Sequence, residues 1–267
     1  MLEDDDGRTG LGMDFLCVCI RVPKSGSTSL ANMLNVAFAA RRTFYMPHTL
    51  NLDAAISRFQ EARFARTRWR NLLKRYHTCS LQKAFDIIAS RASDGDLING
   101  GHIDFPSVRK SIRRKSKIIT LLREPTSRCR SEYEYCRNSY LRSSHLRRID
   151  SSARCKAAGK YSFDGFLDFL LDWREGYGDV AANYMGWDGQ QDLNEFHAEN
   201  VFHSGTLEQS KKFENGLSEK MNMRIRLPHD NTGKNENHFA ITRSQQEKIE
   251  KIYPRDFQLY EWQLAHA

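Results

Sequence analysis

The sequence lacks several features that would assign it to common functional classes. Its six cysteines include no Cys-x-x-Cys pair, which argues against a zinc site. No apolar run reaches the roughly 18 residues that a membrane-spanning helix needs. The first 14 residues are acidic and glycine-rich, unlike a signal peptide. We therefore expect a soluble chain, most simply cytoplasmic, although a piece of a membrane-anchored lumenal protein would look the same.

The composition permits a large folded domain with an anionic partner. Hydrophobic residues make up 40% of the 267 residues and aromatic residues 11%, which is enough for a substantial core. The 41 Lys and Arg residues exceed the 33 Asp and Glu residues, so the formal net charge is +8. Such a balance suits a nucleotide, an acidic glycan, a nucleic acid or an anionic membrane.

The cysteines that are present have two interpretations. Cys17 and Cys19 lie two residues apart in an expected strand, so they should face the same side as small apolar core residues. Cys129, Cys136 and Cys155 could supply one disulfide, but no disulfide framework is evident.

A Walker A loop is also missing, yet a different phosphate-binding loop is present. The apolar run 15–20 leads into Lys24, Ser25 and Gly26, and a helical pattern follows from about Thr28. The lysine stands at the start of the loop and no second glycine follows, which disfavours a nucleoside triphosphatase. Unpaired N–H groups at a helix start favour an anion, and Gly26 lets the backbone approach it. Hydroxyl donors come from Ser25, Ser27, Thr28 and Ser29.

Strands alternate with helices along the chain, which indicates an α/β fold with a mainly parallel sheet. We expect buried strands at 15–21 and 117–122, and two closing helices near 243–253 and 255–264. The expected organisation is a flexible arm at 1–14 and a single domain at 15–267. That domain would contain a helical insertion at about 41–78 and a mobile loop at about 139–160.

A second anion-binding segment follows the strand at 117–122. Arg123 ends that strand, where its guanidinium can grip a phosphate with two parallel N–H bonds. Ser131 lies two helical turns further on and can add a hydroxyl. Arg128 could also bind phosphate or could pair with Glu124 at i+4. Open α/β sheets bind ligands at their carboxyl edge, so the two segments would suit a nucleotide with phosphates at two positions.

Together, Pro23-Lys24-Ser25-Gly26-Ser27-Thr28 and Arg123-Glu124-Pro125 with Arg128 and Ser131 resemble the sulfotransferase superfamily. The first segment is similar to that family's 5′-phosphosulfate loop and the second to its 3′-phosphate motif. Glu124 replaces the commoner Asp. The resemblance implies a P-loop-like three-layer α/β/α fold and the donor 3′-phosphoadenosine 5′-phosphosulfate, with no metal required.

A third segment narrows the resemblance. Residues 101–105, which contain His102, look like the His-containing segment of the Golgi carbohydrate sulfotransferases, notably the uronosyl (heparan) 2-O type. Gly100 stands where that type has a second His. A chain of this kind would be lumenal in the Golgi rather than cytoplasmic. The acceptor implied is the hydroxyl of a carbohydrate, possibly an anionic one.

The resemblance also assigns roles to residues of this sequence. Lys24 would stabilise the departing phosphate, and His102 would take the proton from the acceptor hydroxyl. The hydroxyls of 25–29 would hold the 5′-phosphate, while Arg123 and Ser131 would hold the 3′-phosphate. A late loop containing Asn231, Thr232 and Lys234 either covers the nucleotide or is an ordinary surface loop.

Two alternatives stay open at this point. The same chemistry could act on a small alcohol, a lipid or a peptide tyrosine. The chain could instead be a nucleotide-binding or nucleic-acid-binding module without catalysis, although it has no helix-turn-helix, zinc knuckle or aromatic RNA-reading motif. Binding of adenosine 3′,5′-bisphosphate separates the transferase interpretations from the last one.

Overall fold

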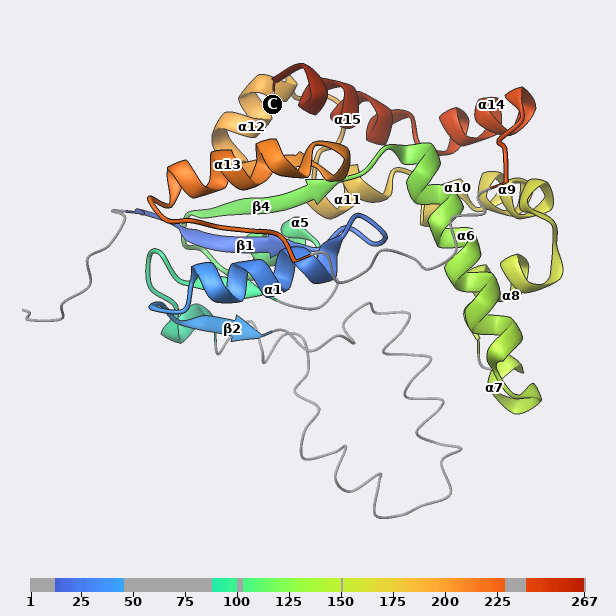
Figure 1. The fold of residues 1–267 in the computed structure, drawn as a ribbon, viewed down its shortest axis with the longest axis horizontal. Helices are drawn as coiled ribbons and strands as arrows, with labels where there is room; N and C mark the ends of the chain where they lie inside the picture. Colours follow the sequence, from blue (N-terminus) through green and yellow to red (C-terminus); the bar gives the residue numbers. More distant parts are fainter. Residues whose placement is uncertain (1–12, 46–87, 100–102, 150, 229–238, 267) are drawn as a thin grey trace, which may run out of the picture.

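A parallel β-sheet forms the centre of the computed structural model, which describes residues 13–45, 88–99, 103–149, 151–228 and 239–266 (Figure 1). All strand pairs in it are parallel, and the strand order is β2-β3-β1-β4-β5. The described strands are β1 Leu16–Ile20, β2 Thr43–Tyr45, β3 Leu97–Asn99, β4 Ser116–Leu122 and β5 Val201–Thr206. The prediction of an α/β fold with a parallel sheet is confirmed.

Helices cover both faces of the sheet. Side chains alternate along each strand, so each strand contributes to two cores. Cys17 and Cys19 of β1 point to one side, where they pack with residues of α1 (Ser27–Ala37) and α13 (Ser210–Lys220). Leu16, Val18 and Ile20 point to the opposite core. The elements that contribute to that core include α5 (Phe105–Ser111), α11 (Val180–Met185), α12 (Leu193–Asn200) and α15 (Pro254–His266). The result is the expected three-layer arrangement.

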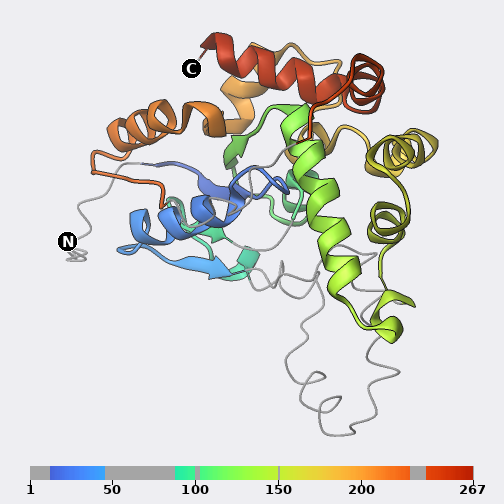
Figure 2. The ribbon, with the colours of Figure 1, turned by 45° about the vertical axis from the view of Figure 1, so that its right-hand side comes forward.

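A group of helices extends from the carboxyl end of β4. Figures 1 and 2 show α6 (Pro125–Arg142) running away from the sheet, with α8 (Ala153–Lys160) beside it and α7 (His145–Ile149) at its far end. Tyr133 of α6 joins this group through rings at 5.2 Å from Phe163 and 5.3 Å from Phe166. Both rings belong to α9 (Phe163–Asp172). Two more helices pack against α9, namely α10 (Arg174–Tyr177) and α14 (Arg243–Ile252).

The interpretation of 139–160 as an irregular loop is wrong. The end of α6, all of α7 and all of α8 lie in this range, while position 150 lies outside the described residues. Local capping explains the difference. Arg148 donates to the carbonyls of Tyr140, Leu141 and Ser143 at the end of α6, and the Ser152 hydroxyl accepts the N–H of Cys155. These capping groups are polar, so no hydrophobic periodicity in the sequence predicts the helices.

Other predictions fall partly or wholly outside the described residues. In the expected helical insertion at 41–78, the structure shows the strand β2 at the beginning, and the rest from position 46 is not described. The arm at 1–12 and the loop with Asn231, Thr232 and Lys234 are not described either. In the part of the chain that the structure covers, no helix is both long and apolar enough to span a lipid bilayer.

A buried ion-pair network fixes α6 to the end of the chain. The side chain of Arg128 is 1% exposed, and its guanidinium lies 3.3 Å from Glu132 and 3.4 Å from Asp256. Asp256 also accepts the N–H of Ala182, at 2.9 Å, and the Arg128 guanidinium lies over the ring of Tyr253, at 4.5 Å. Arg128 thus pairs within the core rather than with Glu124, and it is not a phosphate ligand in this arrangement.

Replacing Arg128 should destabilise the fold strongly. The substitution Arg128→Met leaves Asp256 buried without its cation and removes one of the two arginines that pair with Glu132, which costs about 3–5 kcal/mol. We expect thermal denaturation to show Tm lowered by roughly 10 °C or more. The matched control is Arg243→Met, because Arg243 pairs with Glu247 at an exposed helix position and should contribute less than about 1 kcal/mol. Equal Tm values for the two variants would contradict a buried network.

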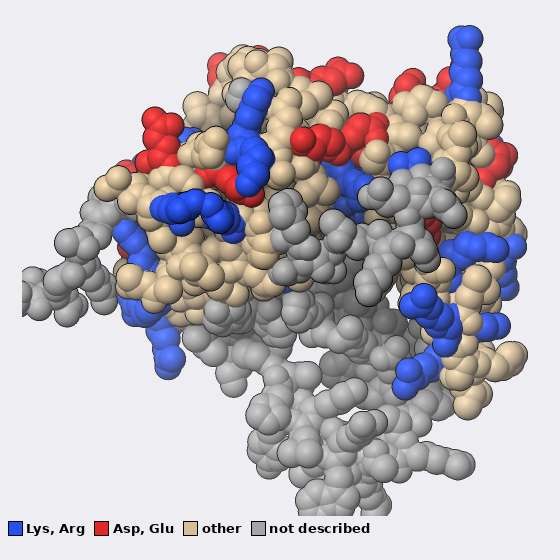
Figure 3. Space-filling model, viewed as in Figure 1, with Lys and Arg blue, Asp and Glu red and all other residues tan. Residues whose placement is uncertain are grey.

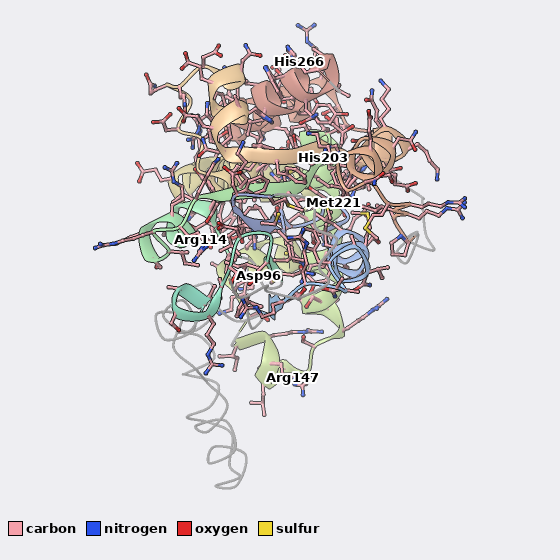
Figure 4. All side chains as sticks on the ribbon, turned by 90° about the vertical axis from the view of Figure 1, so that its left-hand side faces the viewer. Asp96, Arg114, Arg147, His203, Met221 and His266 are labelled. Atoms are coloured by element: carbon pink, nitrogen blue, oxygen red, sulfur yellow. The ribbon has the colours of Figure 1, made fainter. Side chains whose placement is uncertain are left out.

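Two buried histidines should make the fold sensitive to acid. Burial lowers the pKa of His203 (Figure 4), whose Nε2 lies 2.9 Å from the carbonyl oxygen of Phe213, to about 4. Burial likewise lowers the pKa of His197, which stacks on Trp262 at 3.9 Å, to about 4. The unfolded chain takes up these protons near pH 6.5. Stability should therefore fall as the pH drops from 6.5 to 4.

The histidine His197 offers a direct test of this pH dependence. His197→Phe keeps a ring against Trp262 but removes one titrating group, so the loss of stability between pH 6.5 and 4 should shrink by roughly 1–3 kcal/mol. Urea denaturation at several pH values measures it. His145→Phe, at an exposed position, serves as the control and should leave the slope unchanged. An unchanged slope in His197→Phe would refute the assignment.

Candidate functional site

The two predicted anion-binding segments leave the same edge of the sheet. β1 and β4 are neighbouring parallel strands, with Ile20 opposite Thr120. The hydroxyl of Thr120 also donates to the carbonyl of Ile20, at 2.8 Å. Because parallel strands end at a common edge, the Lys24 loop and the Arg123 segment begin side by side.

The Lys24 loop has a backbone shape suited to an anion. Residues 23–26 form a turn, with Lys24 at φ 66° and Gly26 at φ 70° in the left-handed region. Gly26 occupies the N-cap position of α1, and among the described residues no side chain caps this helix and no acidic residue lies in its first turn. By contrast, side chains cap α5, α6, α8, α9, α12 and α14. The N–H groups at the start of α1 are thus left available to a ligand.

Hydroxyl groups surround this helix start. Ser25 is fully buried, and its Oγ has no hydrogen-bond partner within the described part of the chain. Ser29 is also buried, and Thr28 accepts a hydrogen bond from Arg21, at 3.5 Å. Ser27 occupies the first helical position. A buried hydroxyl without a partner is costly unless a ligand satisfies it, so Ser25 indicates a polar ligand here.

Arg123 connects the two segments directly. Its Nη1 donates to the carbonyl oxygen of Lys24, at 3.2 Å. Burial lowers the pKa of Arg123 from its usual value, while nearby Glu208 opposes that effect. The guanidinium therefore lies against the lysine loop rather than on an unrelated surface, and no further hydrogen bond from it to the described residues is seen.

Lys24 is held by a residue that the sequence did not single out. Its ammonium lies 4.3 Å from the centre of the Tyr135 ring, a cation–π contact. Burial lowers the pKa of Lys24, with smaller opposing effects from nearby groups such as Glu132. Tyr135 lies three turns into α6, and only its helical phase relative to Ser131, four residues earlier, could have indicated it.

The segment after Arg123 is organised by Glu124. Its carboxylate accepts the N–H groups of Thr126, at 3.0 Å, and Ser127, at 2.5 Å, and so caps α6. The longer Glu thus performs the capping for which Asp is also suited. Ser131 lies on this helix and is half-buried. Ser131 and Tyr135 lie on the same helix, so the start of α6 sets the position of both.

The expected base cannot be placed. His102 lies outside the described residues. Asp104, two residues later, accepts the N–H and the hydroxyl of Ser107, at 2.8 and 2.9 Å, and caps α5. No cluster of three or more His, Cys, Asp or Glu side chains suited to a metal occurs in the described ranges.

The site can be compared with known proteins. A protein-family model described as "Sulfotransferase family" matches residues 14–263. A solved structure titled "Crystal structure of mouse sulfotransferase SULT7A1 complexed with PAP" is 16% identical in sequence, with a TM-score of 0.41. The match covers 89% of this chain and 63% of the mouse protein's chain. No curated protein sequence matches. Because the family model spans nearly the whole sequence, including both predicted anion-binding segments, the chain belongs to the sulfotransferase family.

Proposed function

We propose that this chain transfers a sulfuryl group from 3′-phosphoadenosine 5′-phosphosulfate to a hydroxyl of a carbohydrate. The observation that supports it most is the 3.2 Å hydrogen bond from Arg123 to the Lys24 carbonyl, since it joins the two phosphate-binding segments. Membership of the sulfotransferase family supports the same chemistry. We also propose that residues 15–267 form one domain.

The residues of the lysine loop fit the 5′ end of the donor. The uncapped start of α1 offers N–H groups, and Ser25 offers a buried hydroxyl that lacks a partner among the described residues. Ser27, Thr28 and Ser29 would add hydroxyls around the same helix start. Arg123 and Ser131 would hold the 3′-phosphate, so that binding at two points fixes the direction of the donor.

Lys24 would supply the positive charge where the reaction develops negative charge. The donor contributes a sulfuryl group attached to a phosphate leaving group, and the transfer resembles an in-line phosphoryl transfer. The partly buried ammonium of Lys24 interacts more strongly with an anion than a fully hydrated one would. Tyr135 would keep that ammonium near the loop between turnovers.

His102 would act as the base. A ring nitrogen of its imidazole would accept the proton of the acceptor hydroxyl as the oxygen attacks, which suits a group with a pKa near neutrality. The role comes from the similarity of residues 101–105 to the Golgi carbohydrate sulfotransferases. No metal is needed for any of these steps.

The choice of a carbohydrate acceptor rests on the same similarity and on charge. The net charge of +8 favours an anionic acceptor. Figure 3 shows basic side chains around α6 and α7, where the exposed Arg142 and Arg147 lie. A small alcohol, a lipid or a peptide tyrosine would require the same donor site but not this basic surface.

Donor binding can be tested without any acceptor. Adenosine 3′,5′-bisphosphate at 100 times its Kd should raise Tm by roughly 5–10 °C, because it binds only the folded chain. Arg123→Ala should weaken its affinity by roughly 10- to 100-fold, since one charged hydrogen-bonding group is lost. Isothermal calorimetry measures the affinities.

The matched control for Arg123 is Arg114→Ala. Arg114 pairs with Asp94 and precedes β4, at the opposite edge of the sheet, so its loss should leave the affinity within about twofold. If the bisphosphate failed to raise Tm, or if both variants lost affinity equally, the proposed donor site would be wrong.

Catalysis is tested with a labelled donor and a panel of acceptors. The wild-type chain should label a polysaccharide in preference to small alcohols, lipids and tyrosine peptides. His102→Ala should lower kcat by roughly 100- to 10,000-fold. Affinity for the bisphosphate should change little, since His102 is proposed to contact the acceptor. The exposed His145→Ala serves as control. Activity retained in His102→Ala would remove His102 as the base, and labelling confined to a non-sugar acceptor would replace the proposed acceptor class.

A further inference from the structure

Two cysteines lie on helices that pack against each other, α6, which also carries Ser131, and α8. Cys136 of α6 is 3% exposed and Cys155 of α8 is partly exposed, and both belong to the same hydrophobic cluster. Both are free thiols. The sequence left open whether any of Cys129, Cys136 and Cys155 pair, and the contacts between α6 and α8 place Cys136 opposite Cys155.

The register between α6 and α8 is fixed on both sides of the thiols. One turn before Cys136, Glu132 pairs with Arg154, the residue that precedes Cys155. On the other side, Arg137 donates to the carbonyl of Ala158, at 3.3 Å. Gly159 then packs so closely under Tyr140 that an added Cβ would collide with the ring. The two helices therefore cannot slide apart without losing these contacts.

The local chemistry favours a reactive thiolate on Cys155. It is the third residue of α8, next to the helix N-terminus, and the positive end of a helix stabilises a thiolate. The neighbouring Cys136 side chain is the main cause that lowers the pKa of Cys155, assisted by Ser152 and by the charge of Arg154. The neighbouring Cys155 side chain and burial raise the pKa of Cys136, which holds its proton.

The remaining described cysteines lack this environment. Cys17, Cys19 and Cys129 are fully buried, and burial raises the pKa of each to about 12. Such thiols are poor nucleophiles at neutral pH. Reactivity in the described part of the chain is therefore concentrated in one pair.

We propose that Cys136 and Cys155 form a disulfide that cross-links α6 to α8. The oxidant is a small disulfide such as oxidised glutathione. The Cys155 thiolate attacks one of its sulfurs, forms a mixed disulfide and releases one glutathione thiolate. Cys136 then gives up its proton and attacks the Cys155 sulfur, releasing a second glutathione thiolate. Two protein thiols are thereby oxidised, and one glutathione disulfide is reduced to two thiols.

The cross-link would brace the helix that starts the 3′-phosphate segment. Ser131 lies little more than one turn before Cys136 on α6, and the closed loop contains α7. A bond across a loop of this length stabilises a fold mainly by restricting the unfolded chain. It should raise Tm by roughly 5–10 °C. This inference does not depend on the proposed transferase activity.

The experiment uses the full chain equilibrated in reduced and oxidised glutathione. Free thiols are then blocked with N-ethylmaleimide in denaturant, and the unreduced peptides are mapped by mass spectrometry. We expect a linked pair of peptides containing Cys136 and Cys155, abolished by dithiothreitol. In parallel, Tm should be higher in the oxidised than in the reduced sample.

Variants make the result specific to this pair. Cys155→Ser should abolish both the linked peptides and the Tm difference. Cys129→Ala, which changes another cysteine of α6, should keep both. The proposal is overturned if Cys136 and Cys155 both carry N-ethylmaleimide after oxidation, if they carry only glutathione, or if either is linked to another cysteine. A linked pair without a Tm increase would overturn the bracing of α6.

Discussion

The parallel pairing of β1 with β4 is the constraint on which the candidate site depends. The pairing places the two chain exits at one edge, although Lys24 and Arg123 are 99 residues apart in sequence. The guanidinium can then reach the carbonyl of Lys24. Any shift of register between these strands would separate the two segments, because no other described hydrogen bond joins Arg123 to the Lys24 loop.

Helix starts are used in two different ways around this edge. Glu124 caps α6, because its carboxylate accepts two N–H groups of the first turn. This cap fixes the direction in which the chain leaves β4. α1 begins with Gly26 and keeps its N–H groups free of side-chain caps from the described residues. An acidic cap at α1 would occupy the place that an anion needs, so the missing cap and the neighbouring lysine have a common physical reason.

Local patterns predicted much of the fold and the outline of the site. The apolar runs before Arg21 and Arg123 predicted β1 and β4, and the Gly, Lys and hydroxyl pattern predicted the loop between β1 and α1. The family match supports the resemblance on which the site roles rest, although those roles for Lys24, Ser25 and Ser131 stay predictions. His102 stays a prediction as well.

Features that depend on distant contacts could not be predicted. One partner of Arg128, Asp256, is 128 residues away, and the sequence suggested Glu124 rather than the two observed partners, Asp256 and Glu132. The helices within 139–160 depend on capping by Arg148 and Ser152, which a polar composition conceals. Tyr135 of α6 contacts Lys24 of another segment, and in the sequence only its spacing of four residues from Ser131 hints at that contact.

The pairing of Arg128 with Asp256 also orders events during synthesis. A nascent chain that has emerged only as far as α14 contains the β1 and β4 segments but not this carboxylate. Arg128 then lacks its partner Asp256. Packing α6 in its final place would bury a guanidinium whose charge is only partly neutralised. We therefore expect α6 to settle into its final position only after α15 has left the ribosome. The edge of the sheet that carries the candidate site would in that case be completed only after α15 is synthesised.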